Sequence, residues 1–118
     1  MTNESDYYEG SPFAAILRGE LEGTVIARDD EQKFAIISSM EPEAAVHWLA
    51  VPFESGFSTS DMKTAQSDRF TALLDFALAQ THALVADYPV LENGFTIKFH
   101  CGAYETVPHA KFHILSVE

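Results

Sequence analysis

The 118-residue sequence is poor in cysteine and has no long apolar run. Its one cysteine, Cys101, cannot form an internal disulfide, which agrees with a reducing compartment. No apolar run approaches the roughly 20 residues that a membrane-spanning helix needs. Residues 1–10 carry three acids and no base, unlike a signal peptide. We therefore expect a cytoplasmic protein that makes no membrane contact.

Basic residues are also scarce, with 7 Lys and Arg against 18 Asp and Glu and a formal net charge of -11. Nucleic-acid backbones require a basic footprint, so we expect no DNA or RNA partner. A small phosphorylated ligand stays open, because a pocket can be locally positive on an acidic protein. Hydrophobic residues make up 47% of the chain, which is typical of one globular domain at this length.

The pattern of apolar residues predicts two helices and five strands. A short helix is expected with Ser11 as its N-cap and Pro12 in its first turn, ending at Gly19. Apolar side chains spaced three and four apart predict a long helix, with Ser67 as its N-cap and Pro89 ending the pattern. Strands are expected over residues 24–28, 33–38, 46–52, 95–99 and 107–117. This mixture predicts an α+β domain over residues 11–118, with a mainly antiparallel sheet of about five strands, preceded by a frayed arm at 1–10.

The last expected strand carries three basic side chains at alternate positions. Because side chains alternate across a strand, His109, Lys111 and His113 share one face. The intervening residues are apolar and face the other way. Buried strand faces do not normally collect cations, so this face indicates a functional site.

The segment Val107–Leu115 (VPHAKFHIL) resembles the signature of the histidine-triad (HIT) family, in which three histidines alternate with hydrophobic residues. Residues 12–20 resemble the opening helix of that family. Residues 25–52 resemble its first three strands, with His47 where the family keeps a fourth histidine. The resemblance covers the chain from Pro12 to the C-terminus and implies a HIT-like fold.

The resemblance implies hydrolysis or transfer at the α-phosphate of a nucleotide, with the middle histidine attacking phosphorus. Here Lys111 stands at the position of that nucleophile, while His109, His113 and His47 match the supporting positions. A lysine with an ordinary pKa of about 10.4 leaves only about 10⁻³ to 10⁻⁴ of its amine uncharged at neutral pH. We therefore expect a protein that binds a nucleotide or small phosphorylated metabolite, with activity weak or lost.

Four further residues are candidates for ligand contacts. Thr106 offers a hydroxyl to a phosphate, and Ser39 stands where the family carries an acidic residue for the ribose. His100 and Glu105 complete the set of ligand-binding candidates. Relatives commonly pair into one continuous sheet, so the resemblance also implies a homodimer.

Three alternatives stay open. The first is a working hydrolase or transferase that acts on a phosphoramidate or dinucleoside polyphosphate through Lys111 or a histidine. The second reads Lys111 as a solvated strand lysine in a non-catalytic interaction protein. The third is a metal protein, because imidazole and thiolate are ligands that zinc prefers; its candidate ligands are His100, Cys101, His109 and His113. Lys111 would place a positive charge against such an ion, so no metal or other cofactor is expected.

Overall fold

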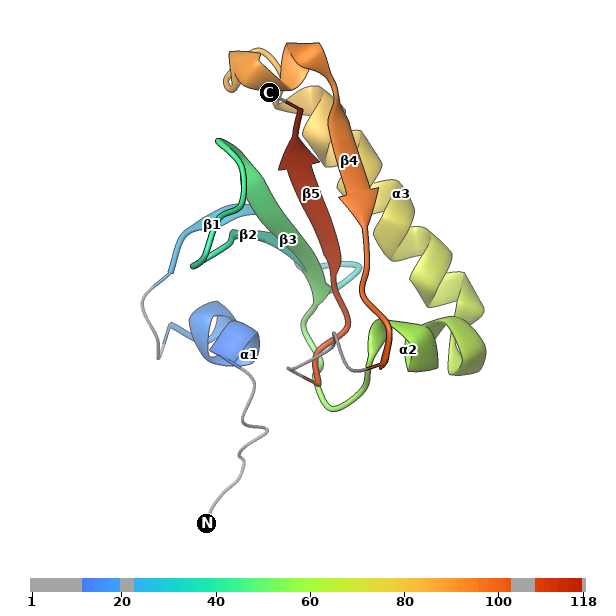
Figure 1. Cartoon of the computed structure of the whole chain (residues 1–118). Helices are drawn as coiled ribbons and strands as arrows, with labels where there is room; N and C mark the ends of the chain where they lie inside the picture. Colours follow the sequence, from blue (N-terminus) through green and yellow to red (C-terminus); the bar gives the residue numbers. More distant parts are fainter. Residues whose placement is uncertain (1–11, 20–22, 103–107, 118) are drawn as a thin grey trace.

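The computed structural model describes residues 12–19, 23–102 and 108–117 (Figure 1). The expected arm at 1–10, the cap Ser11 and the candidates Glu105 and Thr106 lie outside the described residues. The helices are α1 (Pro12–Leu17), α2 (Thr59–Ala65), α3 (Ser67–Ala83) and the 3₁₀ helix η1 (Pro89–Asn93). The strands are β1 (Val25–Asp29), β2 (Phe34–Ser38), β3 (His47–Pro52), β4 (Phe95–Lys98) and β5 (Phe112–Ser116).

The five strands form one sheet in the order β1-β2-β3-β5-β4, and every neighbouring pair is antiparallel. Strand β5 lies between β3 and β4, although it comes last in the sequence. The register pairs Trp48 with Ile114 across β3 and β5, and Ile97 with Ile114 across β4 and β5. This confirms the predicted α+β class with a five-stranded antiparallel sheet, one long helix and a short N-terminal helix.

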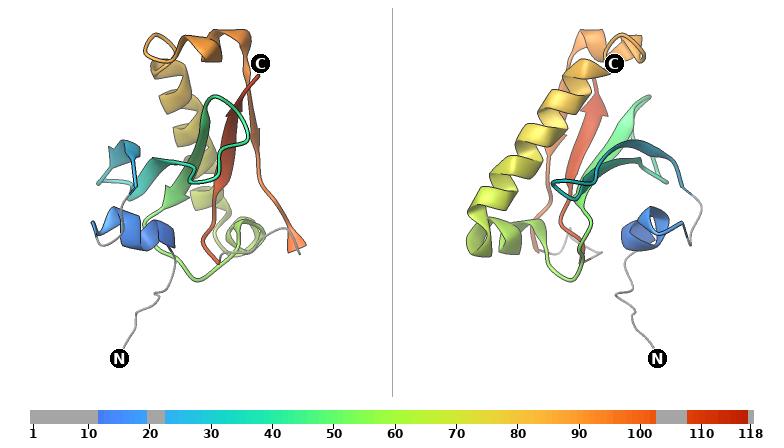
Figure 2. Two further views of the ribbon diagram at one scale, coloured as in Figure 1. Left: turned by 60° about the vertical axis from the view of Figure 1, so that its left-hand side comes forward. Right: turned by 180° about the vertical axis from the view of Figure 1, so that it is seen from behind.

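The two faces of the sheet are covered by different helices, as the two views in Figure 2 show. Helix α3 covers one face and buries the larger core, which includes Phe34, Trp48, Leu73 and Ile114. Helix α1 lies against the other face with a smaller cluster, built from the buried residues Ile16, Ala35, Ile37, Leu49 and Val51. Alternation along β3 explains the division, since Trp48 and Ala50 join the first core while Leu49 and Val51 join the second.

The last strand is shorter than the sequence predicts, because the sheet ladder begins only at Phe112 and not at residue 107. Just before β5, His109 forms an isolated parallel bridge with Phe57, which precedes α2. Strand β4 ends at Lys98, one residue before the predicted end, and His100 lies beyond it. Two of the five histidines, His47 and His113, therefore lie on strands.

The predicted cap of the long helix is wrong by one residue. Gln66 is the N-cap of α3, and it is also the C-cap of α2, so the two helices adjoin through this residue. Helix α2 is not predicted by the sequence analysis; its N-cap is Ser58, whose hydroxyl accepts from the Asp61 N–H at 3.0 Å. Helix α3 ends at Ala83, before Pro89, which instead opens η1. No helix in the described part of the chain has the length and apolar character to cross a membrane.

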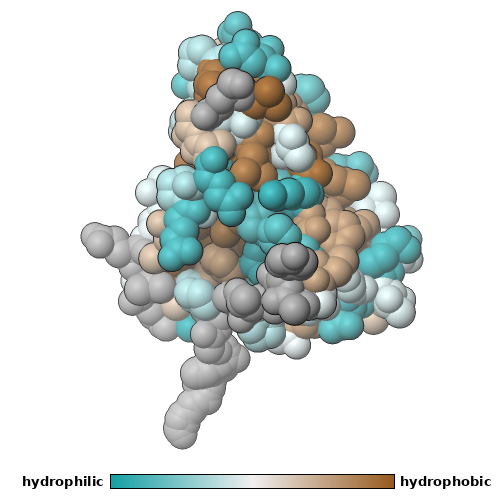
Figure 3. All heavy atoms as spheres, in the orientation of Figure 1, coloured by the Kyte–Doolittle hydropathy of each residue, from teal (hydrophilic) through white to brown (hydrophobic). Residues whose placement is uncertain are grey.

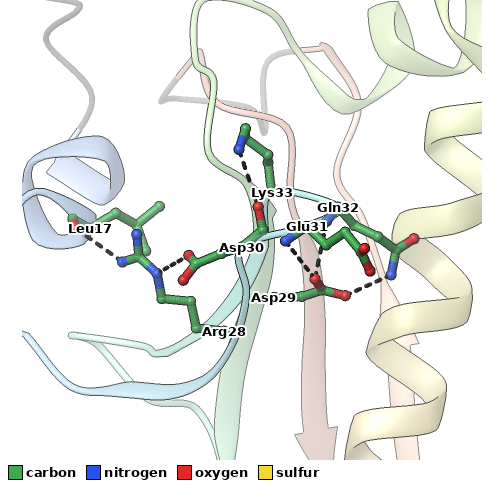
Figure 4. A network of polar contacts seen from close by, with 7 residues as sticks. All are labelled: Leu17, Arg28, Asp29, Asp30, Glu31, Gln32 and Lys33. Carbon is green, nitrogen blue, oxygen red and sulfur yellow. Dashed lines mark hydrogen bonds and ion pairs between the residues drawn. The ribbon is translucent and has the colours of Figure 1, made fainter.

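The turn between β1 and β2 is held by a polar network (Figure 4). The Asp29 carboxylate accepts hydrogen bonds from the Gln32 side chain and from the backbone N–H groups of Glu31 and Gln32. The hydrogen bond from the Gln32 side chain is the main cause that lowers the pKa of Asp29. Arg28 donates to Asp30 at 2.6 Å and to the Leu17 carbonyl at 3.3 Å, which ties this hairpin to the end of α1.

A second arginine ties the same hairpin to α3. Arg69 donates two hydrogen bonds to the Glu54 carboxylate, at 2.7 and 2.8 Å, and two to the carbonyls of Gln32 and Lys33. Its guanidinium lies over the Phe34 ring, 4.6 Å from the centroid. Burial opposes ionisation of Glu54, but the hydrogen bonds from Arg69 hold the pKa of this carboxyl below its ordinary value. The β1–β2 hairpin is thus fastened to a helix on each side of the sheet.

Candidate functional site

The candidate site lies on the sheet face that carries α1. Phe112 and Ile114 of β5 belong to the core under α3, so the intervening His113 points to the opposite face. On that face it meets His47 of β3 and His100, which follows β4. Figure 3 views the molecule from this side and shows a band of hydrophilic surface between apolar areas.

His47 and His113 are joined by a hydrogen bond of 3.0 Å between His47 Nε2 and His113 Nδ1. The backbone N–H of Glu43 donates to His47 Nδ1 at 3.1 Å, so this nitrogen carries no proton. The proton of His47 is therefore on Nε2, which donates to His113 Nδ1. It follows that neutral His113 carries its own proton on Nε2 and offers an N–H donor at that atom.

Both imidazoles of this pair are held neutral. Burial is the main cause that lowers the pKa of His113 to about 4, and the neighbouring His100, His47, Lys111 and Lys98 lower it further. Burial also lowers the pKa of His47, although Glu43 opposes this and Lys98 adds to it. At neutral pH the pair therefore contributes hydrogen-bonding capacity to the site and no positive charge.

His100 extends the pair into a cluster of three histidines. Its ring lies 4.7 Å from the His113 ring between centroids, in an edge-to-face arrangement, and it is half-buried. Two residues earlier, Lys98 approaches Glu43 at 3.9 Å across the rim of the cluster. The residue that orders the His47 tautomer is thus also the acidic neighbour of Lys98.

His109 is completely buried beside the end of β3. Its Nε2 lies 2.6 Å from the Pro52 carbonyl oxygen, which can only accept, so the imidazole donates through Nε2. Burial lowers the pKa of His109 to about 4, Lys111 lowers it further, and the Pro52 hydrogen bond and Glu54 oppose the shift. Neutral His109 therefore has its one N–H engaged by the backbone.

Lys111 is also buried, with 8% of its surface exposed, so the reading of this residue as a solvated strand lysine is wrong. Its Nζ lies over the Phe13 ring of α1, 5.3 Å from the centroid. The same ring packs edge-to-face on His109 at 5.6 Å between centroids. Because the charge of Lys111 lowers the pKa of both His109 and His113, the ammonium lies within electrostatic reach of both imidazoles.

The remaining candidates adjoin this group. Ser39 follows β2, and its backbone N–H donates to the His47 carbonyl at 2.9 Å. Its hydroxyl accepts from the Glu41 N–H at 3.2 Å, a contact within its own loop. Cys101 is exposed and its sulfur accepts a hydrogen bond from Ser60, whereas His109 is buried at the end of β3. Within the described residues, no group of three or more His, Cys, Asp or Glu side chains could hold a metal ion.

Sequence reasoning misses three residues that shape this site. Phe13 contacts both Lys111 and His109, Glu43 fixes the tautomer of His47, and Thr59 hydrogen-bonds to the backbone of Lys111. Glu43 and Thr59 act through a backbone amide and a single hydroxyl, for which the sequence carries no signal. The arrangement as a whole combines one buried ammonium with neutral imidazoles, a set of groups suited to binding an anion.

Comparison with known proteins identifies the fold. The structure matches a HIT family hydrolase from Clostridium thermocellum with a TM-score of 0.75 and 22% identity, covering 93% of this chain and 92% of that one. A histidine triad protein from Clostridium difficile matches with a TM-score of 0.75 and 22% identity, over 92% and 91% of the two chains. A histidine triad nucleotide-binding protein from Candida albicans matches with a TM-score of 0.68 and 22% identity, over 88% and 72%.

No family model matches the sequence, and no curated protein matches it either. The structural likeness at this level of identity shows a HIT-like fold.

Proposed function

We propose that this protein binds a nucleotide or another small phosphorylated metabolite on the α1 face of its sheet, with Lys111 as the phosphate anchor. The observation that carries the proposal is the burial of Lys111 among neutral imidazoles, beside Phe13. An ammonium binds phosphate as a compact point charge, and its attraction is strengthened where water is excluded.

The histidines fit this role as hydrogen-bonding groups. His113 offers its Nε2–H as a donor because its Nδ1 already accepts from His47. His100 lies against His113 and is half-buried, so we assign it a ligand contact at the rim. His47 orients His113 through the hydrogen bond to its Nδ1. His109 packs edge-to-face on Phe13, the ring that the Lys111 ammonium contacts. Glu105, Thr106 and Ser39 stay predictions as further ligand contacts.

Relatives of the same fold support a phosphorylated ligand. The Candida albicans structure is named a nucleotide-binding protein, and the Clostridium thermocellum structure is named a hydrolase. We propose that this chain keeps the binding and has weak or no hydrolytic activity. A protonated lysine has no lone pair with which to attack phosphorus, whereas a neutral imidazole does.

The proposal is tested by thermal-shift titration of chelator-treated protein with AMP, GMP and inorganic phosphate. A ligand that binds only the native state stabilises it by about 2.7 kcal/mol at 100 times its dissociation constant, which raises the unfolding midpoint. We expect a rise with a nucleotide, and we expect it to vanish in Lys111→Met. The control Lys63→Met removes an exposed lysine of α2 and should keep the rise. No rise with any ligand at millimolar concentration contradicts the proposal.

A working hydrolase is the second candidate, and the position of His100 favours it. This half-buried imidazole lies against His113 at the edge of the site, where it can reach a ligand that the buried His109 cannot. Turnover of a nucleoside phosphoramidate by the purified protein, lost in His100→Gln, supports this candidate. Absence of turnover removes it.

We also propose a homodimer. In the described part of the chain, β4 is the last strand of the sheet and pairs only with β5, so its outer edge is open to a second copy. Analytical ultracentrifugation at micromolar concentration should give twice the mass of the chain. A monomer under these conditions contradicts the dimer and leaves the binding proposal in place.

A further inference from the structure

A short loop runs beside the segment that carries His109 and Lys111. The Gly56 N–H donates to the Pro108 carbonyl at 2.6 Å, and Phe57 forms a parallel bridge with His109. This loop follows β3 and leads directly into α2. It therefore supports residues 108–111 over the stretch where the antiparallel ladder of β5 has not yet begun.

Thr59 continues this contact at Lys111. The Thr59 hydroxyl accepts from the Lys111 N–H at 2.9 Å and donates to the Lys111 carbonyl at 3.0 Å. The residue is 1% exposed, so both hydrogen bonds are made away from water. Thr59 is the first residue of α2, and the Ser58 cap fixes that turn. One side chain thus binds both main-chain groups of the residue whose ammonium we propose as the phosphate anchor.

We propose that Thr59 is the positioning residue of Lys111. Its hydroxyl takes the place of a neighbouring strand, and it holds the main chain of residue 111 extended, so that the side chain stays on the α1 face. The proposal rests on the proposed function for its effect on binding. The effect on the main chain does not depend on any ligand.

The physical reason lies in what removal of the hydroxyl leaves behind. In Thr59→Val a methyl group replaces the hydroxyl at nearly the same volume, and the Lys111 N–H and carbonyl each lose a buried hydrogen bond. The segment relieves this by shifting toward other partners or water. Because Lys111 approaches Phe13 through this same backbone, the shift displaces the ammonium from the phosphate position.

The experiment compares Thr59→Val, Thr59→Ser and Thr81→Val with the unaltered protein. Thr81 is the matched control, because it is fully buried in α3 and its hydroxyl donates to the Ala77 carbonyl at 2.7 Å, in the core on the other face of the sheet. Amide hydrogen exchange of Lys111, followed by NMR against Ile114 of β5, reports the main chain without any ligand. Titration with AMP measures whether the Lys111 ammonium still binds a phosphate group.

In Thr59→Val we expect the Lys111 amide to exchange at least about tenfold faster while Ile114 is unchanged, and AMP to bind at least about tenfold more weakly. Thr59→Ser should restore both, and Thr81→Val should change neither. The proposal is overturned if Lys111 exchange is unaltered in Thr59→Val, or if that variant binds AMP as tightly as the unaltered protein. Failure of the unaltered protein to bind AMP, GMP or inorganic phosphate overturns the proposed function alone, because the exchange measurement still decides whether Thr59 holds Lys111.

Discussion

The two faces of the sheet bury very different groups. Under α3 the buried core is almost wholly apolar, with Phe34, Trp48 and Leu73 among its largest members. Under α1 the apolar cluster is small, and His47, His109 and Lys111 are buried on the same side. Apolar burial stabilises the fold, whereas buried polar groups cost free energy unless they are hydrogen-bonded.

This difference indicates which face of the sheet stabilises the fold. The α3 face can supply most of the stability because each apolar side chain removed from water contributes favourably. The α1 face instead keeps its imidazoles neutral by burial and satisfies them through the backbone, as at Pro52 and Glu43. We expect substitutions on the α3 face to change stability and those on the α1 face to change binding and pH response.

The largest effect expected on stability comes from the α3 face. Leu73→Ala removes a completely buried side chain and leaves a cavity, which should lower the free energy of unfolding by about 2–5 kcal/mol. Leu78→Ala, in an exposed position of the same helix, should change it by less than about 0.5 kcal/mol. Urea unfolding followed by circular dichroism measures both. If folded Leu73→Ala also loses its affinity for AMP, the expectation that α3-face substitutions change stability and not binding is contradicted.

The α1 face should make the protein sensitive to acid. His109 titrates at about 4 in the folded protein and near 6.5 when unfolded, so the unfolded chain binds the proton first as pH falls. The contribution of His109 to the free energy of unfolding is fully present above pH 6.5 and is lost as pH falls from 6.5 to 4. The shift of this buried group corresponds to a loss on the order of 3 kcal/mol.

Urea unfolding of His109→Gln at pH 7 and pH 4.5 isolates this loss from that of the carboxylates. The glutamine amide can still donate to the Pro52 carbonyl but has no proton to gain, so the variant should lose less stability on acidification. His82→Gln is the control, because His82 is exposed on α3. Equal acid sensitivity of His109→Gln and the unaltered protein would show that the burial of this histidine is not what sets the response.

The two faces also differ in how far the sequence predicts them. Helix α3 follows from its apolar spacing, since Leu73, Ala77 and Thr81 recur every four residues and all face the core. Helix α2 escapes such reasoning because its sequence is mostly polar and buries only Thr59 and Met62. Hydrophobic periodicity therefore predicts the helix that covers the α3 core, but it does not predict helix α2, which supports the segment before β5 on the α1 face.

At the site, alternation alone predicts that positions 109, 111 and 113 share a face, although only the last of them lies on β5. The alternation before β5 depends on the loop at 56–59, which is remote in sequence and has no periodic pattern. The tautomer of His47 depends on a backbone N–H, a group that every residue other than proline carries. These contacts emerge only from the folded chain.

A third experiment asks whether the α1 face has lost only its nucleophile. Lys111→His places a neutral imidazole where the resemblance expects the attacking group. If the rest of the pocket is intact, hydrolysis of a nucleoside phosphoramidate should rise at least about tenfold over the unaltered protein, or 1.4 kcal/mol in activation free energy. Release of the amine product measures it, with Lys63→His as the control. A folded variant without turnover would show that the pocket has diverged beyond this residue.

The smallest effect should distinguish the two arginines that fasten the β1–β2 hairpin. Arg69 makes a bidentate pair with Glu54, donates to two carbonyls and covers Phe34, and its side chain is 25% exposed. Arg28 is 43% exposed, and its partner Asp30 is 75% exposed, so solvent screens most of that interaction.

Arg69→Met should therefore cost about 1 kcal/mol of unfolding free energy, and Arg28→Met less than about 0.5 kcal/mol. Raising the ionic strength should reduce the difference between these two costs, because salt weakens the Arg69–Glu54 pair more than it weakens the packing of a methionine. Thermal unfolding of both variants at low and high salt makes the comparison. Equal costs for the two substitutions would mean that the hairpin is held as firmly on the α1 side as on the α3 side. That result would contradict the expectation that the α3 face supplies most of the stability.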